Sequence, residues 1–297
     1  MRIALLGVGL IGGSIARALR SGDGAMGPIE RIAAWSPTGA GPRAALEAGV
    51  VDAAATGLDE AVGGADLVVL AAPPIACIDL IRLLGDLRER LAPNCVVTDV
   101  ASTKARVIEA AVEVGLPFVG GHPMAGAEAT GFGASRADLF HDHPWVVVAT
   151  ETSPRGGVDR VEALATACGA RPLRLDAATH DRAVAAISHV PLVLAAALVE
   201  AVVGSPDGPA RPDRALEAQL ASSGWASKTR LALGSPEMGG GIAATNAPAI
   251  AAGLRDVRTV IDAWIAELEA EDVALAPLVE RFRAARDRLT RSDGEPG

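Results

Sequence analysis

One histidine of the chain stands in a stretch whose composition suits proton transfer. His122 lies within GGHPMAGAE at 120–128, directly after the apolar run 117–119. Glycines let the backbone turn sharply, and Pro123 restricts the backbone immediately after the histidine. Imidazole is the side chain best able to exchange a proton near neutral pH. The stretch therefore predicts a tight loop, but a histidine in such a loop is more often structural than catalytic, and both roles stay open until the rest of the chain is considered.

A glycine-rich turn lies near the amino terminus, between an expected strand at 2–6 and an expected helix at 14–20. Its sequence, GVGLIG, has the spacing of a dinucleotide-binding turn. In such turns the first glycine makes the bend, the second admits the pyrophosphate and the third packs helix on strand, while the helix amino terminus attracts the phosphates. The residues expected to contact the cofactor here are Gly7, Gly9, Leu10, Ile11 and Gly12.

The next expected strand, 31–35, bears on the choice between NAD and NADP. An acidic residue usually ends this strand and binds the ribose 2′-hydroxyl of NAD. Here the strand runs into Ser36, Pro37 and Thr38, and Arg43 follows at a distance suited to a 2′-phosphate. We expect Ser36, Thr38 and Arg43 to contact the cofactor and NADP to be preferred. NAD bound without the carboxylate is the alternative.

Strands continue to alternate with helices up to about residue 175. Apolar strands are expected at 66–71 and 95–100, further strands at 145–149 and 171–175, and helices at 75–91 and 160–168. After the strand at 66–71, Ala72 and Pro73 should form a turn beside the cofactor. This alternation predicts an α/β fold, with a Rossmann-type, mostly parallel, doubly wound sheet over residues 1–175.

Ser102 follows the strand at 95–100, within DVASTK at 99–104. Serine is a good amino-terminal cap, so Ser102 could simply cap the next helix. The carboxyl end of a central strand is also where ligands bind in open α/β sheets. Both interpretations remain open at this point.

Residues 176–297 carry no strand pattern and predict an all-helical second domain. A long helix is expected at 176–203, a loop at 206–212, three or four further helical runs ending with 257–289, and a disordered tail at 291–297. The run 183–203 is nearly long enough to span a bilayer, but its polar residues favour a buried core helix. One small bundle could not cover so apolar a helix, so we expect an interlocked homodimer.

Composition narrows the classes of function. The 297 residues have a net charge of −9, which argues against nucleic acid as a partner. Three widely spaced cysteines suggest free thiols in a reducing, cytoplasmic location, with no disulfide framework and no metal site. The apolar amino terminus resembles a short signal peptide, but its glycines are better explained by the cofactor turn. We expect no membrane association.

The helical half adds polar residues in apolar surroundings. His180-Asp181 and Ser188-His189 lie on the expected long helix, and Arg230 ends the segment GWASKTR at 224–230. A histidine inside an apolar helix is usually a core residue, and Arg230 could be an ordinary surface arginine. Near a nicotinamide site, an arginine could instead bind a substrate carboxylate through two hydrogen bonds.

The sequence resembles the prephenate and arogenate dehydrogenases of tyrosine biosynthesis over nearly its whole length. The resemblance is carried by GVGLIGGSIARAL at 7–19, DVASTK, GGHPMAGAEATGF at 120–132, ISHVPLVLAAAL at 187–198 and SGWASKTRLA at 223–232. It implies oxidative decarboxylation of prephenate or arogenate by hydride transfer to NAD or NADP. The length leaves no room for a chorismate mutase or regulatory domain, so we expect neither.

The resemblance also implies roles for individual residues. His122 matches the base that takes the proton of the C4 hydroxyl, and Ser102 the serine that binds the same hydroxyl. Arg230 matches the arginine that holds the ring carboxylate, and His189 a histidine lining the substrate pocket. Two acidic residues also have matches in the family. Asp181 matches a carboxylate that holds the residues lining the pocket and does not itself touch the substrate, and Glu128 matches an acidic residue at the rim of the pocket.

One position departs from prephenate-specific members of the family. Some of those carry a second histidine three residues after the one matching His189, where this chain has Leu192. Arogenate-using members often have an apolar residue there, and the run GGGI at 239–242 also resembles theirs. Prephenate and arogenate differ at the end of the molecule that this position faces, so the substrate stays open.

Two other functions remain as alternatives. One is a different dehydrogenase with a Rossmann domain and a helical dimer domain, of the β-hydroxyacid or pyrroline-carboxylate type. Those enzymes place a lysine or a hydroxyl group on the helical domain, and the long helix here has no lysine. The other is a dinucleotide sensor that has lost catalysis, against which the presence of Ser102, His122 and Arg230 argues.

Overall fold

The computed structural model describes residues 1–22, 25–126, 129–204 and 213–292. The chain divides into two compact units, Met1–Ile250 and Ala251–Gly297. The first contains the sheet and all of the candidate site residues that the structure describes.

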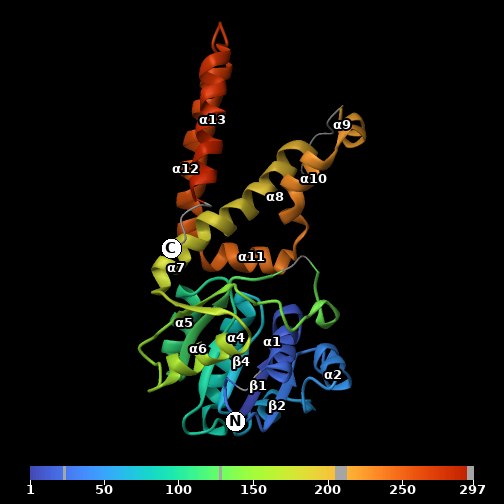
Figure 1. The fold of residues 1–297 in the computed structure, drawn as a ribbon, viewed down its shortest axis with the longest axis vertical. Helices are drawn as coiled ribbons and strands as arrows, with labels where there is room; N and C mark the ends of the chain where they lie inside the picture. The colour runs from blue at the N-terminus through green and yellow to red at the C-terminus, as the bar shows by residue number, and fades with distance from the viewer. Residues whose placement is uncertain (23–24, 127–128, 205–212, 293–297) are drawn as a thin grey trace. The chain divides into compact units, whose positions relative to one another are not determined.

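A single eight-stranded sheet forms the centre of the first unit (Figure 1). Its spatial order is β3-β2-β1-β4-β5-β6-β7-β8, and every neighbouring pair is parallel except β6 and β7. This confirms the mostly parallel, Rossmann-type fold. The strands are β1 Arg2–Leu6, β2 Arg31–Trp35, β3 Ala53–Ala54, β4 Leu67–Leu70, β5 Val96–Asp99, β6 Phe118–Pro123, β7 Pro144–Val148 and β8 Arg171–Arg174.

Helices cover both faces of this sheet. Side chains of α1, α2 and α6 belong to one apolar core and those of α3, α4 and α5 to another. Strands enclosed on both faces are apolar along their whole length, which is why β1 and β4 show continuous apolar runs. The helices are α1 Leu10–Ser21, α2 Ala40–Glu47, α3 Leu58–Val62, α4 Pro74–Asp86, α5 Ala105–Glu113 and α6 Gly157–Ala167.

The register of the central strands brings their carboxyl ends to one edge. Leu6 at the end of β1 pairs with Trp35 of β2 and with Leu70 of β4, and Leu70 pairs with Asp99 of β5. The glycine turn, the turn at residues 72–73 and the segment 99–104 therefore leave the sheet at the same edge. That edge is where open α/β folds bind their ligands.

The structure corrects one expectation about His122. The predicted loop begins later, because β6 continues through residues 120–123 and His122 pairs with Val146 of β7. Gly121 accounts for the close fit, since a Cβ atom there would lie 2.5 Å from the carbonyl oxygen of Asp99. A strand fixes a side chain more firmly than a loop, so His122 projects from the rigid part of the sheet.

The long helix expected at 176–203 is present with one irregularity. α7, Ala177–Val184, passes through a π-turn at Ala185–His189 into α8, Val190–Val203. Asp176 caps α7 by accepting a hydrogen bond from the Thr179 amide. Pro191 has no N–H and crowds the preceding turn, which gives a physical reason for the wider turn before it. Such π-turns occur often at functional sites.

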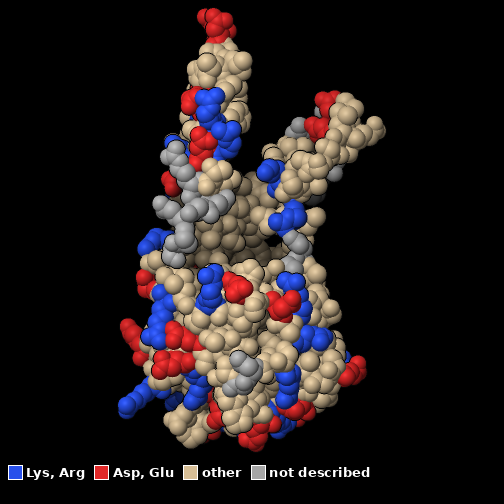
Figure 2. Space-filling view, in the orientation of Figure 1, with Lys and Arg blue, Asp and Glu red and all other residues tan. Residues whose placement is uncertain are grey.

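α8 is far more exposed in the single chain than a core helix would be. Only Val190 and Ala195 of α8 are buried, and Figure 2 shows few charged side chains on this part of the molecule. By length and composition alone, segment 177–203 is long and apolar enough to span a membrane. Only 17% of its most apolar window is buried, whereas a core helix would be mostly buried. The exposure of α8 agrees with the expectation that a single chain cannot cover so apolar a helix, while its burial in a core stays a prediction.

The remaining helices complete both units. In the first unit these are α9 Arg214–Leu220, α10 Ser223–Thr229 with a 3-10 turn at Arg230–Leu233, and α11 Pro236–Thr245. The run expected to end at residue 289 consists of two helices, α12 Ala247–Leu268 and α13 Leu275–Ser292. The rings of Trp264 in α12 and Phe282 in α13 pack against each other, with their centroids 5.0 Å apart. The loop predicted at 206–212 and residues 293–297 of the predicted tail lie outside the described residues.

Candidate functional site

The glycine turn has the shape that a dinucleotide requires. Gly7 has a φ of +100°, and a Cβ atom there would lie 2.3 Å from the carbonyl oxygen of Ala71. A Cβ on Gly12 would lie 2.1 Å from the carbonyl oxygen of Gly7, whereas one on Gly9 would meet nothing within 4 Å. No side chain caps α1, which begins at Leu10. Open space above uncapped amides fits a pyrophosphate.

Two neighbouring cavities extend from this turn along the end of β2. One of about 320 Å³ is lined by Ser36, Thr38 and Arg43, and one of about 480 Å³ by Gly9, Ser36 and Thr38 among others. The Arg43 guanidinium donates a hydrogen bond to the Thr38 carbonyl oxygen at 3.4 Å. Ser36, Thr38 and Arg43 thus lie together, as expected for contacts to the adenosine end of a dinucleotide.

Ala72 and Pro73 also lie at the cofactor edge. They follow β4 directly, and Pro73 is the residue before α4 begins. The neighbouring Ala71 is the residue that Gly7 would strike if it carried a side chain. The turns after β1 and β4 therefore approach each other closely, and the contact of Ala72 and Pro73 with a cofactor stays a prediction.

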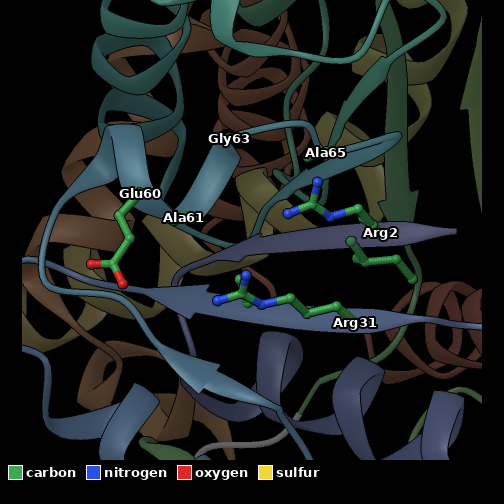
Figure 3. A pocket seen from close by; sticks show the side chains of 8 residues that line it. Arg2, Arg31, Glu60, Ala61, Gly63 and Ala65 are labelled. Atoms are coloured by element: carbon green, nitrogen blue, oxygen red, sulfur yellow. The ribbon is translucent and has the colours of Figure 1, made fainter.

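A different cavity lies at the opposite edge of the sheet (Figure 3). It is lined by Arg2 and Arg31, the first residues of β1 and β2, and by Glu60 of α3. Its volume of about 10 Å³ has room for roughly one water molecule. It is too small for a substrate and has no part in the site.

His122 is the first member of a buried chain of hydrogen bonds. Its Nδ1 lies 2.8 Å from Nε2 of His180, and Nδ1 of His180 lies 2.8 Å from Oδ1 of Asp181. The two rings meet edge to face at 81°. His180 is completely buried, while His122 retains 9% exposure. The long helix thus supplies two residues that hold the histidine of β6 in place.

Asp181 also replaces Ser102 as the cap of α5. It accepts hydrogen bonds from the amides of Lys104 and Ala105, at 2.8 and 2.9 Å. Ser102 is therefore not the cap that its sequence position suggested. Its Oγ is buried and has no hydrogen-bond partner among the described residues. A buried hydroxyl without a partner is costly unless a ligand satisfies it.

A buried ion pair fixes the strand on the amino-terminal side of His122. Lys104 and Asp99 are both fully buried and bonded to each other. Lys104 donates to the carbonyl oxygen of Gly121 at 2.8 Å, and Asp99 accepts from the Gly121 amide at 3.0 Å. Both backbone groups of the residue before His122 are therefore held by this pair.

His189 joins the same assembly through Asn246. The Asn246 amide nitrogen donates to the backbone oxygen of Asp181 at 2.8 Å and lies 3.1 Å from Nδ1 of His189. Nδ1 of His189 is therefore an acceptor, and its buried Nε2 carries the proton with no partner among the described residues. Burial lowers the pKa of His189 to about 4, which keeps the ring neutral.

His122 experiences an environment that opposes positive charge. Burial lowers its pKa well below the usual value, and His180, Lys104 and His189 lower it further. The ring is therefore neutral at ordinary pH and can accept a proton. Hydrogen bonds from His180 and from the Ala105 and Lys104 amides hold the pKa of Asp181 below its usual value, against the opposing effect of burial.

Two further substrate contacts were expected, Arg230 and Glu128. Arg230 is exposed at the start of a 3-10 turn that packs against α8, and it is not part of the chain from His122 to Asp181. Glu128 lies outside the described residues.

Sequence reasoning gave no role to His180, Asn246, Asp99 or Lys104. The sequence pointed to the dipeptide His180-Asp181 but gave a role only to Asp181. It also pointed to DVASTK but gave a role only to Ser102, and not to Asp99 and Lys104 at its two ends.

A Rossmann-type sheet with a dinucleotide turn, joined to helices that support a buried histidine, defines a dinucleotide-dependent dehydrogenase. Comparison with known families agrees. A model of the prephenate dehydrogenase nucleotide-binding domain matches residues 15–173, and one of the prephenate dehydrogenase dimerization domain matches residues 176–284. The chain belongs to the prephenate/arogenate dehydrogenase family of oxidoreductases.

Individual relatives support this membership. Prephenate dehydrogenase of Bacillus subtilis is 32% identical over 240 residues, which cover 80% of this chain and 62% of that protein. The match thus spans less than two thirds of that relative. The crystal structure of Synechocystis arogenate dehydrogenase is 30% identical, with a TM-score of 0.73 over 97% of this chain and 100% of that one. A structure of Aquifex aeolicus prephenate dehydrogenase with hydroxyphenyl propionate and NAD+ has the same fold, at 22% identity and a TM-score of 0.82 over 97% and 98% of the two chains.

Proposed function

We propose that this protein oxidatively decarboxylates prephenate or arogenate. The observation that carries the proposal is the neutral His122, held by His180 and Asp181 within one hydrogen-bonded assembly. Two buried polar groups without a partner among the described residues, Ser102 Oγ and His189 Nε2, are available to a ligand. A hydroxyl group of the substrate would satisfy the first and another polar group the second.

His122 acts as the base in this proposal. It takes the proton of the C4 hydroxyl, the O–H electron pair forms the C4 carbonyl, and hydrogen leaves C4 with its bonding pair. When bound, an oxidised nicotinamide supplies the acceptor for that hydride. Loss of the C1 carboxylate as carbon dioxide then sends its bonding pair through the ring to the C4 oxygen, and the resulting phenolate takes back the proton from His122 to give an aromatic phenol. Ser102 binds the reacting hydroxyl, and Arg230 holds the ring carboxylate, as the family resemblance implies.

A nicotinamide dinucleotide is the cofactor supported by the nucleotide-binding match and the glycine turn. We propose a preference for NADP over NAD. Its support is the missing acid after β2 and the position of Arg43 beside the cavity at Ser36 and Thr38. A 2′-phosphate would gain a charged partner in Arg43.

An apolar contact between α8 and α11 bears on the proposed choice of substrate. Leu192 of α8 lies against α11, where a Cβ on Gly239 would be 3.9 Å from its Cδ2 atom. The two sequence features that separate this chain from prephenate-specific members are therefore neighbours. Arogenate carries an amino acid side chain where prephenate has a keto acid, so this contact is expected to influence the choice between them.

A homodimer in the cytoplasm is the proposed working form. The match to a dimerization domain and the uncovered apolar side chains of α8 support the dimer. All three cysteines are free and buried, in keeping with a reducing compartment. We retain residue 175 as the proposed boundary between the dinucleotide-binding and helical domains.

The test compares prephenate and arogenate, each with NAD and NADP, by the absorbance of the reduced nicotinamide. We expect turnover of at least one substrate, with higher kcat/KM for NADP. Replacing His122→Asn should lower kcat by roughly 1,000-fold and preserve dinucleotide binding. His141→Asn, an exposed histidine substitution, is the control. Absence of turnover with all four combinations would contradict the proposal.

A further inference from the structure

The hydrogen-bonded chain behind His122 determines which nitrogen atoms carry protons. Asp181 is an ionised carboxylate and can only accept, so Nδ1 of His180 donates to it. In the tautomer of His180 that carries its single proton on Nδ1, Nε2 is an acceptor, and Nδ1 of His122 donates to it. The lone pair of His122 is left on Nε2. The structure thus selects one tautomer of the base.

The environment of His122 makes it a weak base when it acts alone. A cation confined to its ring would be buried, and burial first, then His180, Lys104 and His189, hold its pKa well below the usual value. His122 alone would be a weak base for a hydroxyl group. The carboxylate that could stabilise a cation does not touch His122, because His180 lies between them.

We propose that His180 and Asp181 form a proton relay that carries the positive charge away from His122 during the reaction. The proposal rests on the proposed function, in which His122 is the base. As Nε2 of His122 receives the hydroxyl proton, its Nδ1 proton passes to Nε2 of His180. His122 becomes neutral again, and His180 becomes an imidazolium whose Nδ1–H donates to Asp181.

The charges around the relay favour this transfer. Opposite charges in direct contact, as between protonated His180 and Asp181, attract strongly where water is excluded. On the other side, Lys104 is paired with Asp99, and the neutral His189 faces Asn246. Asp181 keeps its two amide hydrogen bonds at the start of α5 throughout, so it remains ionised and only the imidazoles exchange protons.

Two substitutions separate a relay from a support. In His180→Gln the side-chain oxygen can still accept the bond from His122 Nδ1, but it cannot take up a proton. In His180→Ala both functions are lost. The relay predicts that His180→Gln lowers kcat by about 100-fold with little change in KM, and His180→Ala by at least as much. His141→Gln, at a histidine whose side chain is 70% exposed, is the matched control.

The pH dependence of kcat/KM distinguishes the mechanisms further. In the parent the acid limb reports protonation of the pair, with the charge on His180 beside Asp181. In His180→Gln only His122 remains, so the limb should move to lower pH by about one unit or more. Asp181→Asn should move it the same way. Parent-like kcat in His180→Gln, or a lowered kcat with an unmoved limb, would overturn the relay.

A measurement without turnover keeps the inference testable if a variant does not fold. The chain has five histidines, so nitrogen-15 NMR of the labelled parent protein can resolve every ring. We expect a proton on Nδ1 of both His122 and His180, and on Nε2 of His189. A proton on Nε2 of His122 would refute the relay. Loss of activity in His122→Asn together with parent-like His180→Gln would sink the relay alone, whereas parent-like His122→Asn would sink the proposed function.

Discussion

Charged side chains are buried where β5, β6 and α7 meet, whereas large apolar side chains are exposed on the helices that follow. Lys104 and Asp99 are completely buried, while Ile187 is 70% exposed and Leu198 38% exposed. Both arrangements reverse the usual distribution of polar and apolar groups. In the first region every charge finds its partner within the chain. In the second the partners must come from elsewhere.

The polar region depends on partners within its own chain for its stability, whereas the apolar region depends on being covered by another surface. The buried polar groups are tolerable because ionic and hydrogen-bonding partners surround them, so loss of one partner should be costly. The exposed apolar groups gain stability only when another surface covers them, so their importance should appear in association. The dimer that we propose supplies that surface.

The largest effect is expected from breaking the buried ion pair. Lys104→Met leaves the Asp99 carboxylate without its counterion and should lower the free energy of unfolding by about 3–5 kcal/mol, measured by urea denaturation. Arg106→Met removes one member of an exposed pair with Glu109 and should cost less than about 1 kcal/mol. An equal decrease in the free energy of unfolding in the two variants would show that the buried Lys104–Asp99 pair contributes no more stability than an exposed pair.

A charge on the apolar surface should act on association. Leu198→Asp is expected to raise the dimer dissociation constant by roughly 100-fold, since it places an unpaired carboxylate in an apolar interface. Sedimentation velocity over a concentration series measures this. Leu46→Asp, at a leucine of similar exposure on α2, should leave association unchanged. A parent protein that is monomeric at all concentrations would remove the comparison between the two regions.

Acid should destabilise the polar region through His189. Its folded-state pKa of about 4 lies below the value of 6.5 for an unfolded histidine, so the unfolded chain binds the proton first as pH falls. The stability is fully present above pH 6.5 and is lost between pH 6.5 and 4. From pH 7 to 5 this one group should remove roughly 2 kcal/mol from the free energy of unfolding.

Replacing His189→Gln should reduce that loss by the same amount, because glutamine does not titrate. Urea denaturation at pH 7 and pH 5 gives the difference directly. His143→Gln, at an exposed histidine, serves as the control. An unchanged pH dependence in His189→Gln would mean that another group causes the acid sensitivity.

The smallest effect is expected for a charge that belongs to neither region. Arg43 is exposed beside the cavity at the end of β2, where solvent screens its interactions. Arg43→Ser should weaken NADP binding by about tenfold, or ~1.4 kcal/mol, and leave NAD binding unchanged. Titration calorimetry with both dinucleotides measures this. A parallel loss for NAD would show that Arg43 does not contact the 2′-phosphate.

The sequence by itself determined the sheet and the cofactor turn. Apolar runs located most of the strands, because strands covered on both faces need continuous apolar residues. The exposed β8, RPLR, was instead expected from the alternation of helices and strands. The missing strand, β3, has only two residues and carries too short a pattern. GVGLIG was recognisable because its glycine positions are fixed by local backbone geometry. Family membership followed from motifs whose residues are close together in the chain.

Only the tertiary structure decided how the polar residues meet. His122 and His180 are 58 positions apart, and Lys104 and Asp181 are 77 apart. Such pairings depend on where α7 crosses the end of β5, which no local pattern encodes. For the same reason Ser102 looked like a cap, although the distant Asp181 takes that place. The sequence specified a histidine for proton transfer, and the packing of α7 against the sheet supplied the partners that select its tautomer.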